Sequence, residues 1–271
     1  MPFEADGDSG GRVQMIYVSF GLEKAGSTLT ANLTRHLLET AGHPHMPLSA
    51  QDRGDIKSNG NYGRHGELTN NVNDWTPDVV AAMDRLIPDG RIVLLRTHAG
   101  PGAEILKLIN EGRGLCHVAL RDPRDIILSM LDVISRKEKL GRPNRTGIRL
   151  GDVTSAFEPL QVNLESAYQW GTARGVIFLD YENTAFNADI TIAAICEQLG
   201  LALPREKYAT VFAEAAANPN GKLNVGVSMR HRREMSARDQ EAVLAHFADF
   251  YARFYPKATV VIEDGPLAES A

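Results

Sequence analysis

The chain has 271 residues, which suits one α/β domain with a single sizeable core. Its formal net charge is −5 and its sequence pI is near 5.9, so the composition indicates no general affinity for nucleic acids. We find no stretch long and apolar enough to span a bilayer, and the polar, Gly-rich residues 1–11 resemble neither a signal peptide nor an anchor. Cys116 and Cys196 each lie in an apolar stretch, which is typical of buried thiols in a reducing compartment. We therefore expect a cytoplasmic protein with no nucleic-acid or membrane partner.

Apolar runs of strand length alternate with helix-like periodic segments along the chain. The predicted strands cover residues 13–20, 91–95, 115–120 and 176–181. The predicted helices cover residues 27–41, 77–86, 103–111, 125–139, 188–199, 205–217 and 237–254. Ser236 and Asp239 have the spacing of a capping box at the start of the last helix. The alternation predicts a single α/β domain with a central parallel sheet flanked by helices on both faces.

Two polar stretches interrupt this pattern. Residues 50–74 are rich in Asn, Gly and Asp, and residues 141–158 carry Arg142, Arg145 and Arg149. Each stretch is a candidate acceptor-binding element, with a solvated loop as the alternative. The expected organisation is a flexible segment over 1–12, the folded domain over 13–257 and a tail over 258–271.

The first predicted strand runs into a loop with the composition of an anion-binding site, Gly21-Leu22-Glu23-Lys24-Ala25-Gly26-Ser27-Thr28. A strand-loop-helix turn aims backbone N–H groups and a helix N-terminus at one point, which binds an anion. Gly26 lets a phosphate approach the backbone because it has no Cβ. Ser27 and Thr28 offer hydroxyl donors, and Lys24 adds a mobile positive charge. We therefore expect a phosphate or sulfate ester as the ligand, with an ordinary strand-to-helix turn as the alternative.

The position of the lysine separates this loop from that of a nucleoside triphosphatase. In Gly-x-x-x-x-Gly-Lys-Ser/Thr the lysine directly follows the second glycine. Here Lys24 lies two residues before Gly26, so its charge belongs to the entry side of the loop. This argues against an ATP- or GTP-hydrolysing site of the usual kind. A small-molecule kinase on a related core stays open as an alternative function.

Two further motifs follow predicted strands. Arg96-Thr97-His98 ends the second strand, where residues line the ligand crevice of an open parallel sheet. His98 is a candidate base there, with a structural histidine as the alternative. Arg121-Asp122-Pro123-Arg124-Asp125 ends the third strand, and Ser129 follows about one turn into the next helix. Arginine plus a hydroxyl suits a phosphomonoester, whereas an ion-pair cluster of Arg121, Arg124 and Asp125 is the competing interpretation.

Taken in this order, the motifs resemble those of sulfotransferases that use 3′-phosphoadenosine 5′-phosphosulfate (PAPS), in particular the soluble, bacterial-type members. The segment from Lys24 to Thr28 resembles the 5′-phosphosulfate loop of that family. Arg96-Thr97-His98 is similar to its Lys/Arg-Thr-His, whose histidine is the general base. The segment from Arg121 to Ser129 resembles its 3′-phosphate motif, Arg-x-Pro-x-Asp followed by serine.

The resemblance continues downstream, with departures. Tyr181-Glu182-Asn183 is similar to the family's Tyr-Glu-Asp, whose tyrosine contacts adenine. Thr210-Val211-Phe212, followed by Asn218-Pro219, is similar to its Thr-Ser-Phe segment, which makes Thr210 and Phe212 adenine-side candidates; helix core is the alternative for Phe212. Gly221–Gly226 is a degenerate match to the loop that closes over the 3′-phosphate, with Lys222 retained but the arginine missing.

The two missing residues leave questions of their own. Arg230, Arg232 or Arg233 could compensate for the absent arginine, although a solvated basic face explains that run equally well. Leu29 stands where the family often has a tryptophan that stacks on adenine. Adenine stacking would then depend on other residues, or be weaker.

The resemblance implies a P-loop-like nucleotide-binding core and in-line sulfuryl transfer from PAPS to a hydroxyl or amine acceptor. His98 and Lys24 would be catalytic, and Lys24, Ala25, Gly26, Ser27 and Thr28 would hold the 5′-end of the donor. Arg121, Ser129 and Lys222 would bind the 3′-phosphate, and Tyr181, Thr210 and Phe212 the adenine. We expect no metal, since sulfate carries less charge than phosphate. A catalytically inactive nucleotide-binding relative is a further alternative. The acceptor is expected to be a small molecule or a carbohydrate, and the sequence leaves homo-oligomers open.

Overall fold

The computed structural model describes residues 15–43, 70–72, 74–86, 92–217 and 226–263. They contain a five-stranded sheet with the order β2-β3-β1-β4-β5, in which every neighbouring pair is parallel. The strands are β1 Met15–Gly21, β2 Asn70–Asn71, β3 Ile92–Thr97, β4 Gly114–Leu120 and β5 Ile177–Asp180. The predicted fold class is therefore confirmed. The two residues of β2 were not predicted, since so short a strand leaves no alternating pattern.

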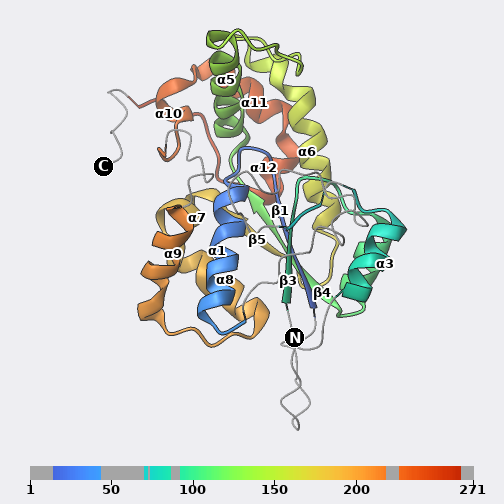
Figure 1. Cartoon of the computed structure of the whole chain (residues 1–271). Helices are drawn as coiled ribbons and strands as arrows, with labels where there is room; N and C mark the ends of the chain where they lie inside the picture. The colour runs from blue at the N-terminus through green and yellow to red at the C-terminus, as the bar shows by residue number, and fades with distance from the viewer. Residues whose placement is uncertain (1–14, 44–69, 73, 87–91, 218–225, 264–271) are drawn as a thin grey trace.

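Helices connect these strands and follow the last strand to the end of the described chain (Figure 1). They are α1 Ser27–Thr40, α3 Pro77–Leu86, α4 Ala103–Asn110, α5 Pro123–Lys139, α6 Phe157–Trp170, α7 Tyr181–Phe186, α8 Ala188–Leu199, α9 Tyr208–Ala216, α10 His231–Glu234, α11 Ala237–His246 and α12 Ala248–Phe254, with 3-10 turns η1 Val153–Ala156 and η2 Arg205–Lys207. Among the described residues, none of the helices is long and apolar enough to cross a membrane.

The helices depart from the prediction at several places, one of which is the short α10, which was not predicted. α6 was not predicted, and its first two residues fall in the stretch predicted to be irregular. α7 begins at Tyr181, because the side chain of Asp180 caps it by accepting a hydrogen bond from Glu182 N at 2.9 Å. The predicted helix 237–254 is broken at Phe247, whose ψ of 32° leaves the helical range. Its start is correct, since the Ser236 hydroxyl accepts from Asp239 N at 3.1 Å.

Hydrophobic cores lie on both faces of the sheet. β1 shows the division, since Ile16, Val18 and Phe20 belong to one core while Tyr17 belongs to the other. Helices α1, α8 and α9 complete the core on the Tyr17 face. Helices α3, α4, α5, α6, α11 and α12 contribute residues to the core on the opposite face. In Figure 1, α3 and α6 lie beside the sheet, whereas α5 and α11 lie above it. Cys116 and Cys196 are buried free thiols, as the sequence predicts.

A buried polar chain links β1, β4 and α8. The Tyr17 hydroxyl donates to Gln198 Oε1 at 2.7 Å, so His117 Nδ1, 3.1 Å away, donates to the Tyr17 oxygen. His117 Nε2 then accepts from the Ser19 hydroxyl at 2.8 Å. Burial lowers the pKa of His117 to about 3, so the imidazole is neutral at ordinary pH. Every member is satisfied, which explains how the sheet holds a histidine in its interior.

The carboxyl ends of β1, β3, β4 and β5 meet at one edge of the sheet, and this edge collects the predicted motifs. Residues just beyond the strands there are Leu22, His98, Arg121 and Tyr181. The C-terminal elements fold back over the same end of the molecule (Figure 1). The domain boundary at residue 257 remains a prediction, although Thr259 O accepts from Arg124 Nη1 at 2.7 Å.

Candidate active site

The loop between β1 and α1 has a backbone conformation that glycine makes possible. Gly26 precedes the first residue of α1 with φ 73°, in the left-handed region. A Cβ there would also lie 2.7 Å from Tyr181 Cδ2, so the tyrosine ring packs directly on the glycine. At the other end of the loop, a Cβ on Gly21 would lie 2.4 Å from Ser27 Cβ. Both glycines therefore allow the loop to turn tightly from the strand into the helix.

The N-terminus of α1 has the properties of an anion-binding site. Within the described part of the chain, no side chain caps it, because Gly26 stands at the cap position. Its first N–H groups have no acceptor within the helix and carry the positive end of the helix dipole. Lys24, half-buried and with φ 68°, belongs to the same loop. An αL conformation is uncommon for a side-chain-bearing residue and recurs at ligand sites.

His98 meets this loop from the neighbouring strand. Its Nδ1 lies 2.6 Å from Gly21 O, and because a carbonyl only accepts, Nδ1 carries the proton. Nε2 then has the lone pair of the neutral ring. It lies 3.5 Å from Ser27 Oγ, at the start of α1. The geometry therefore presents a basic nitrogen to the N-terminal end of α1.

The segment that carries His98 is fixed from both sides. Ala99 N donates to Thr97 Oγ1 at 2.9 Å, and Trp170 Nε1 donates to Ala99 O at 2.9 Å. Trp170 lies at the end of α6, fully buried in the larger core. The position of the imidazole is thus set by a rigid core residue, which suits a group that must meet a reacting atom.

Arg96 belongs to the same site, although the sequence analysis assigned it no role. Its Nη2 donates to Ser27 Oγ at 3.2 Å and lies 3.3 Å from His98 Nε2. Alternate residues of a strand point to the same side, so its spacing of two from His98 was the available signal. Burial, followed by the charge of Arg96, lowers the pKa of His98 from its usual value. The histidine is therefore neutral, and able to take a proton, at neutral pH.

Arg121 lies just beyond β4 and is only 6% exposed. Its Nη1 donates to Lys24 O at 3.2 Å, and its guanidinium carbon is 4.0 Å from the centre of the Tyr181 ring. Its Nε is buried with no hydrogen-bond partner, and no carboxylate of the described residues forms an ion pair with it. A buried cation without a counter-charge is costly, so this position calls for a bound anion.

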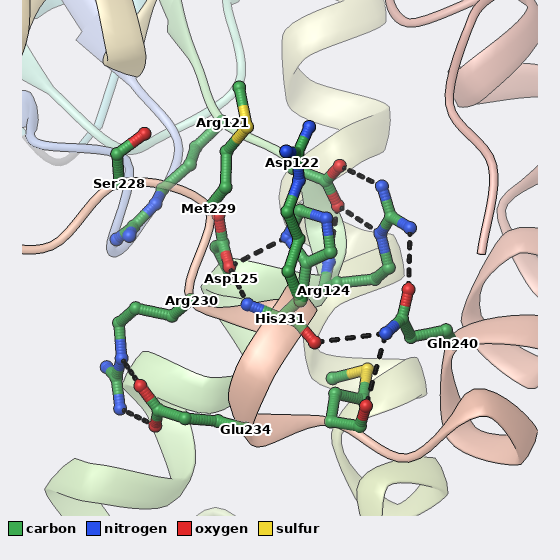
Figure 2. A network of polar contacts seen from close by, with 12 residues as sticks. Arg121, Asp122, Arg124, Asp125, Ser228, Met229, Arg230, His231, Glu234 and Gln240 are labelled. Atoms are coloured by element: carbon green, nitrogen blue, oxygen red, sulfur yellow. Dashed lines mark hydrogen bonds and ion pairs between the residues drawn. The ribbon is translucent and has the colours of Figure 1, made fainter. Parts of the chain in front are cut away.

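Arg124 shows what a structural arginine looks like in the same motif (Figure 2). Its Nη2 is 2.7 Å from Asp122 Oδ2, and Nε donates to Asp122 Oδ1 at 3.0 Å. Its Nη1 donates to Gln240 Oε1 at 3.1 Å and to Thr259 O at 2.7 Å. Asp125 is likewise occupied, because it accepts from His231 N and Nδ1. The ion-pair interpretation therefore holds for Arg124 and Asp125, which have side-chain partners, but Arg121 takes no part in these pairs.

The three arginines considered as substitutes for the missing 3′-phosphate arginine all have carboxylate partners (Figure 2 shows the first). The pairs are Arg230 with Asp132 at 2.6 Å and Glu234 at 2.5 Å, Arg232 with Glu263 at 2.9 Å, and Arg233 with Glu263 at 3.2 Å. A phosphate would have to compete with these carboxylates. Among Arg121, Arg124, Arg230, Arg232 and Arg233, Arg121 is thus the arginine available to an anion.

The other predicted residues are placed as follows. Ser129 is buried on α5, and Tyr181 is buried between Gly26 and Arg121. Thr210 is exposed on α9, whereas Phe212 is half-buried and packs against the core on the α1 face. Lys222 lies outside the described residues. The described residues contain no group of three His, Cys, Asp or Glu side chains that could hold a metal ion.

Comparisons with known proteins agree with this architecture. No protein-family model matches the sequence, and no curated protein matches it significantly. Among solved structures, a retinol dehydratase with androsterone and the inactive cofactor PAP covers 91% of this chain and 84% of its own, with 14% identity and a TM-score of 0.57. The chain has the sulfotransferase fold.

Two further structures place the same fold over almost the whole chain. A retinol dehydratase with retinol and PAP shares 15% identity over 92% of this chain and 84% of its own, with a TM-score of 0.57. The mouse sulfotransferase SULT7A1 complexed with PAP shares 12% identity over 92% of this chain and 88% of its own, with a TM-score of 0.51. The sulfotransferase fold thus extends well beyond the strand ends that carry the motifs.

Proposed function

We propose that this protein transfers the sulfuryl group of PAPS to the hydroxyl or amine of an acceptor. The observation that carries the proposal is the pairing of two unlike groups at one edge of a sulfotransferase fold. One is Arg121, a buried cation with no carboxylate partner among the described residues. The other is His98, whose Nε2 lone pair faces the start of α1. Sulfuryl transfer from PAPS requires a binding site for a charged nucleotide and a group that takes the proton of the acceptor, and these two residues could supply them.

The residues present fit such a donor. Gly26 keeps its backbone open to an anion, and Lys24 with the N–H groups of Gly26, Ser27 and Thr28 would hold the 5′-end. Arg121 would receive a phosphate on its unbonded Nε and its Nη groups, with the Ser129 hydroxyl on the same phosphate. Recognition of the 3′-phosphate in this way would distinguish PAPS from a phosphosulfate without it.

For the adenine contacts, the geometry supports Tyr181, and the family resemblance supports the others. Tyr181 lies between the loop and Arg121, which supports a role for its ring in contacting the nucleotide. Leu29 is buried in the core on the α1 face, so it does not offer a surface for stacking. We assign the remaining contacts to Thr210, Phe212 and Lys222 on the family resemblance.

Charge and proton handling follow from the side chains themselves. When bound, PAPS supplies an activated sulfuryl group. His98 Nε2 would take the proton of the acceptor hydroxyl, and Gly21 O stabilises the imidazolium through Nδ1–H. Arg96 and Lys24 bring positive charge to the place where negative charge develops as the group moves. Since Arg96 donates toward Nε2 at 3.3 Å, it must shift toward the sulfuryl oxygens when the acceptor binds.

The experiment compares nucleotides and then tests turnover. Isothermal titration with adenosine 3′,5′-bisphosphate (PAP) should give binding in the absence of metal, whereas ATP with magnesium should bind weakly. Incubation with radiolabelled PAPS and a panel of phenols, amines, monosaccharides and polysaccharides should label at least one acceptor class. Binding of ATP–magnesium but not PAP would reject the proposal in favour of a kinase. PAP binding without transfer to any acceptor would favour an inactive relative. We expect the reaction to occur in the cytoplasm.

A further inference from the structure

The connection between α5 and α6 carries a concentration of basic side chains. Residues 136–152 include six Lys or Arg and two acidic residues, a formal charge of +4, whereas the whole chain carries −5. All other residues together therefore sum to −9. We call the six cations the basic tip: Arg136, Lys137, Lys139, Arg142, Arg145 and Arg149. In Figure 1 this connection lies at the upper end of the molecule, above α5 and α6.

The backbone of the basic tip is held in place by its own contacts. Asn144 Nδ2 donates to Ile148 O at 2.6 Å, and Asn144 Oδ1 accepts from Thr146 N at 3.1 Å. Ile148 is buried in the larger core, which anchors the loop to the domain. The arginines therefore extend from a fixed platform rather than from a loose chain, which lowers the entropy lost when they bind a ligand.

Ordinary structural roles account for only part of the charge. Arg136, Lys137 and Lys139 lie in the last turn of α5, where cations complement the helix dipole. Arg149 pairs with Asp152, Nη2 to Oδ2, at 2.5 Å. Arg142 and Arg145 are exposed beyond the helix, and no ion pair involving either is found in the described part of the chain. These two arginines, on a protein that is otherwise acidic, indicate a surface for an anionic partner.

The distance to the reactive edge limits what that partner is. α5 starts at Pro123, two residues after Arg121, and its 17 residues span about 25 Å. A small acceptor at His98 does not reach the basic tip, whereas a polymer does. An acidic polysaccharide carries hydroxyl groups for His98 and carboxylate or sulfate groups that arginine binds in bidentate fashion.

We propose that the basic tip binds the distal part of an acidic polysaccharide whose hydroxyl group, about 25 Å away, is the acceptor. This proposal rests on the proposed sulfuryl transfer, and it names the acceptor class for that reaction. The transfer itself moves the sulfuryl group from the phosphate oxygen of the donor to the sugar oxygen, while the hydroxyl proton goes to His98. The polymer contacts at the basic tip take no part in bond making.

The test compares two variants that lose the same charge. Arg142→Ala/Arg145→Ala removes the two arginines without structural roles, and Arg174→Ala/Arg238→Ala removes two exposed arginines elsewhere. Binding to size-defined, partially desulfated heparin oligosaccharides is measured by titration at several salt concentrations, without donor. The first variant should bind roughly ten-fold more weakly, with a slope of log affinity against log salt reduced by about two. The second should bind like the unmodified protein.

Turnover supplies the second measurement. With PAPS present, kcat/KM should rise with oligosaccharide length until the chain spans about 25 Å, and the first variant should lose this dependence. Its affinity for PAP should be unchanged. Equal weakening in both variants, no heparin binding at physiological salt, or tighter binding to phosphatidylserine vesicles than to heparin would each overturn the proposal. A failure of the underlying sulfuryl transfer would look different, since the unmodified protein would then fail to bind PAP or would label no acceptor, while heparin binding without donor would still separate the two variants.

Discussion

Replacement of Arg121 tests the site most directly, because its expected effect on nucleotide binding is larger than its expected effect on stability. Arg121→Met keeps the volume of the side chain and removes a buried charge that has no carboxylate partner in the described structure. The variant loses the contact with the Tyr181 ring, worth about 1–2 kcal/mol, and gains from the absence of an unpaired buried cation. The free energy of unfolding should therefore change by no more than about 1–2 kcal/mol.

The loss in nucleotide binding should be larger. A hydrogen bond to a charged group contributes about 1.5–3 kcal/mol, and a guanidinium makes two such bonds to a phosphate. Loss of about 3 kcal/mol or more corresponds to at least a roughly 100-fold increase in the Kd for PAP. Isothermal titration measures this Kd, and differential scanning fluorimetry measures Tm with and without PAP. The PAP-dependent rise in Tm should disappear in this variant.

Arg124 provides the matched control, three residues further along the chain. Arg124→Met leaves the Asp122 carboxylate without its bidentate partner and removes the bonds to Gln240 and Thr259. Breaking a buried pair in this way costs about 3–5 kcal/mol, which lowers Tm by roughly 6–20 °C. The remaining folded protein should still bind PAP. If Arg121→Met unfolds as easily as Arg124→Met and keeps its PAP affinity, Arg121 is structural and the site is misassigned.

Three further predictions concern the base, the loop and the sheet. His98→Ala should lower kcat by about 10²–10⁴-fold with the Kd for PAP nearly unchanged. Because burial and Arg96 lower the pKa of His98, the rate of the unmodified enzyme should fall only below about pH 6.5. Loss of PAP binding in H98A would contradict the assignment. Gly26→Ala combines a left-handed backbone strain of about 1–2 kcal/mol with contact against the Tyr181 ring, whereas Gly42→Ala carries the strain alone. Thermal unfolding and PAP titration should therefore show a larger loss of stability and of PAP affinity in G26A. Equal losses in the two variants would show that the ring contact is unimportant. The pKa of His117 is depressed in the folded state, so stability is lost as pH falls from about 6.5 toward about 3, by up to about 1.4 kcal/mol per pH unit. Urea unfolding at pH 7 and pH 5 should show a smaller pH dependence in His117→Gln than in the unmodified protein, and an equal dependence would place the titration elsewhere.

Local pattern was enough for most of the sheet. The strands β1, β3 and β4 are apolar runs buried on both faces of the sheet, and the edge strand β5 is a shorter apolar run in which Phe178 is exposed. β2 and α7 are too short to leave a periodic signal, and α7 also depends on the cap provided by Asp180. The break at Phe247 divides a continuous helical pattern, and it could not be read from periodicity alone.

The sequence by itself determined which motifs follow which strands, and therefore that Lys24, His98 and Arg121 would come to one edge of a parallel sheet. It did so because strand ends and residue types are local properties of the chain. The tertiary structure decided the roles. Arg121 and Arg124 are the same residue type in one motif, yet Arg124 is neutralised by Asp122 and held by Gln240, while Arg121 lacks a carboxylate among the described residues. The tautomer of His98 likewise depends on Gly21 O, 77 residues away. Partners that arrive from distant parts of the chain leave no trace in local spacing, and they separate a binding arginine from a structural one.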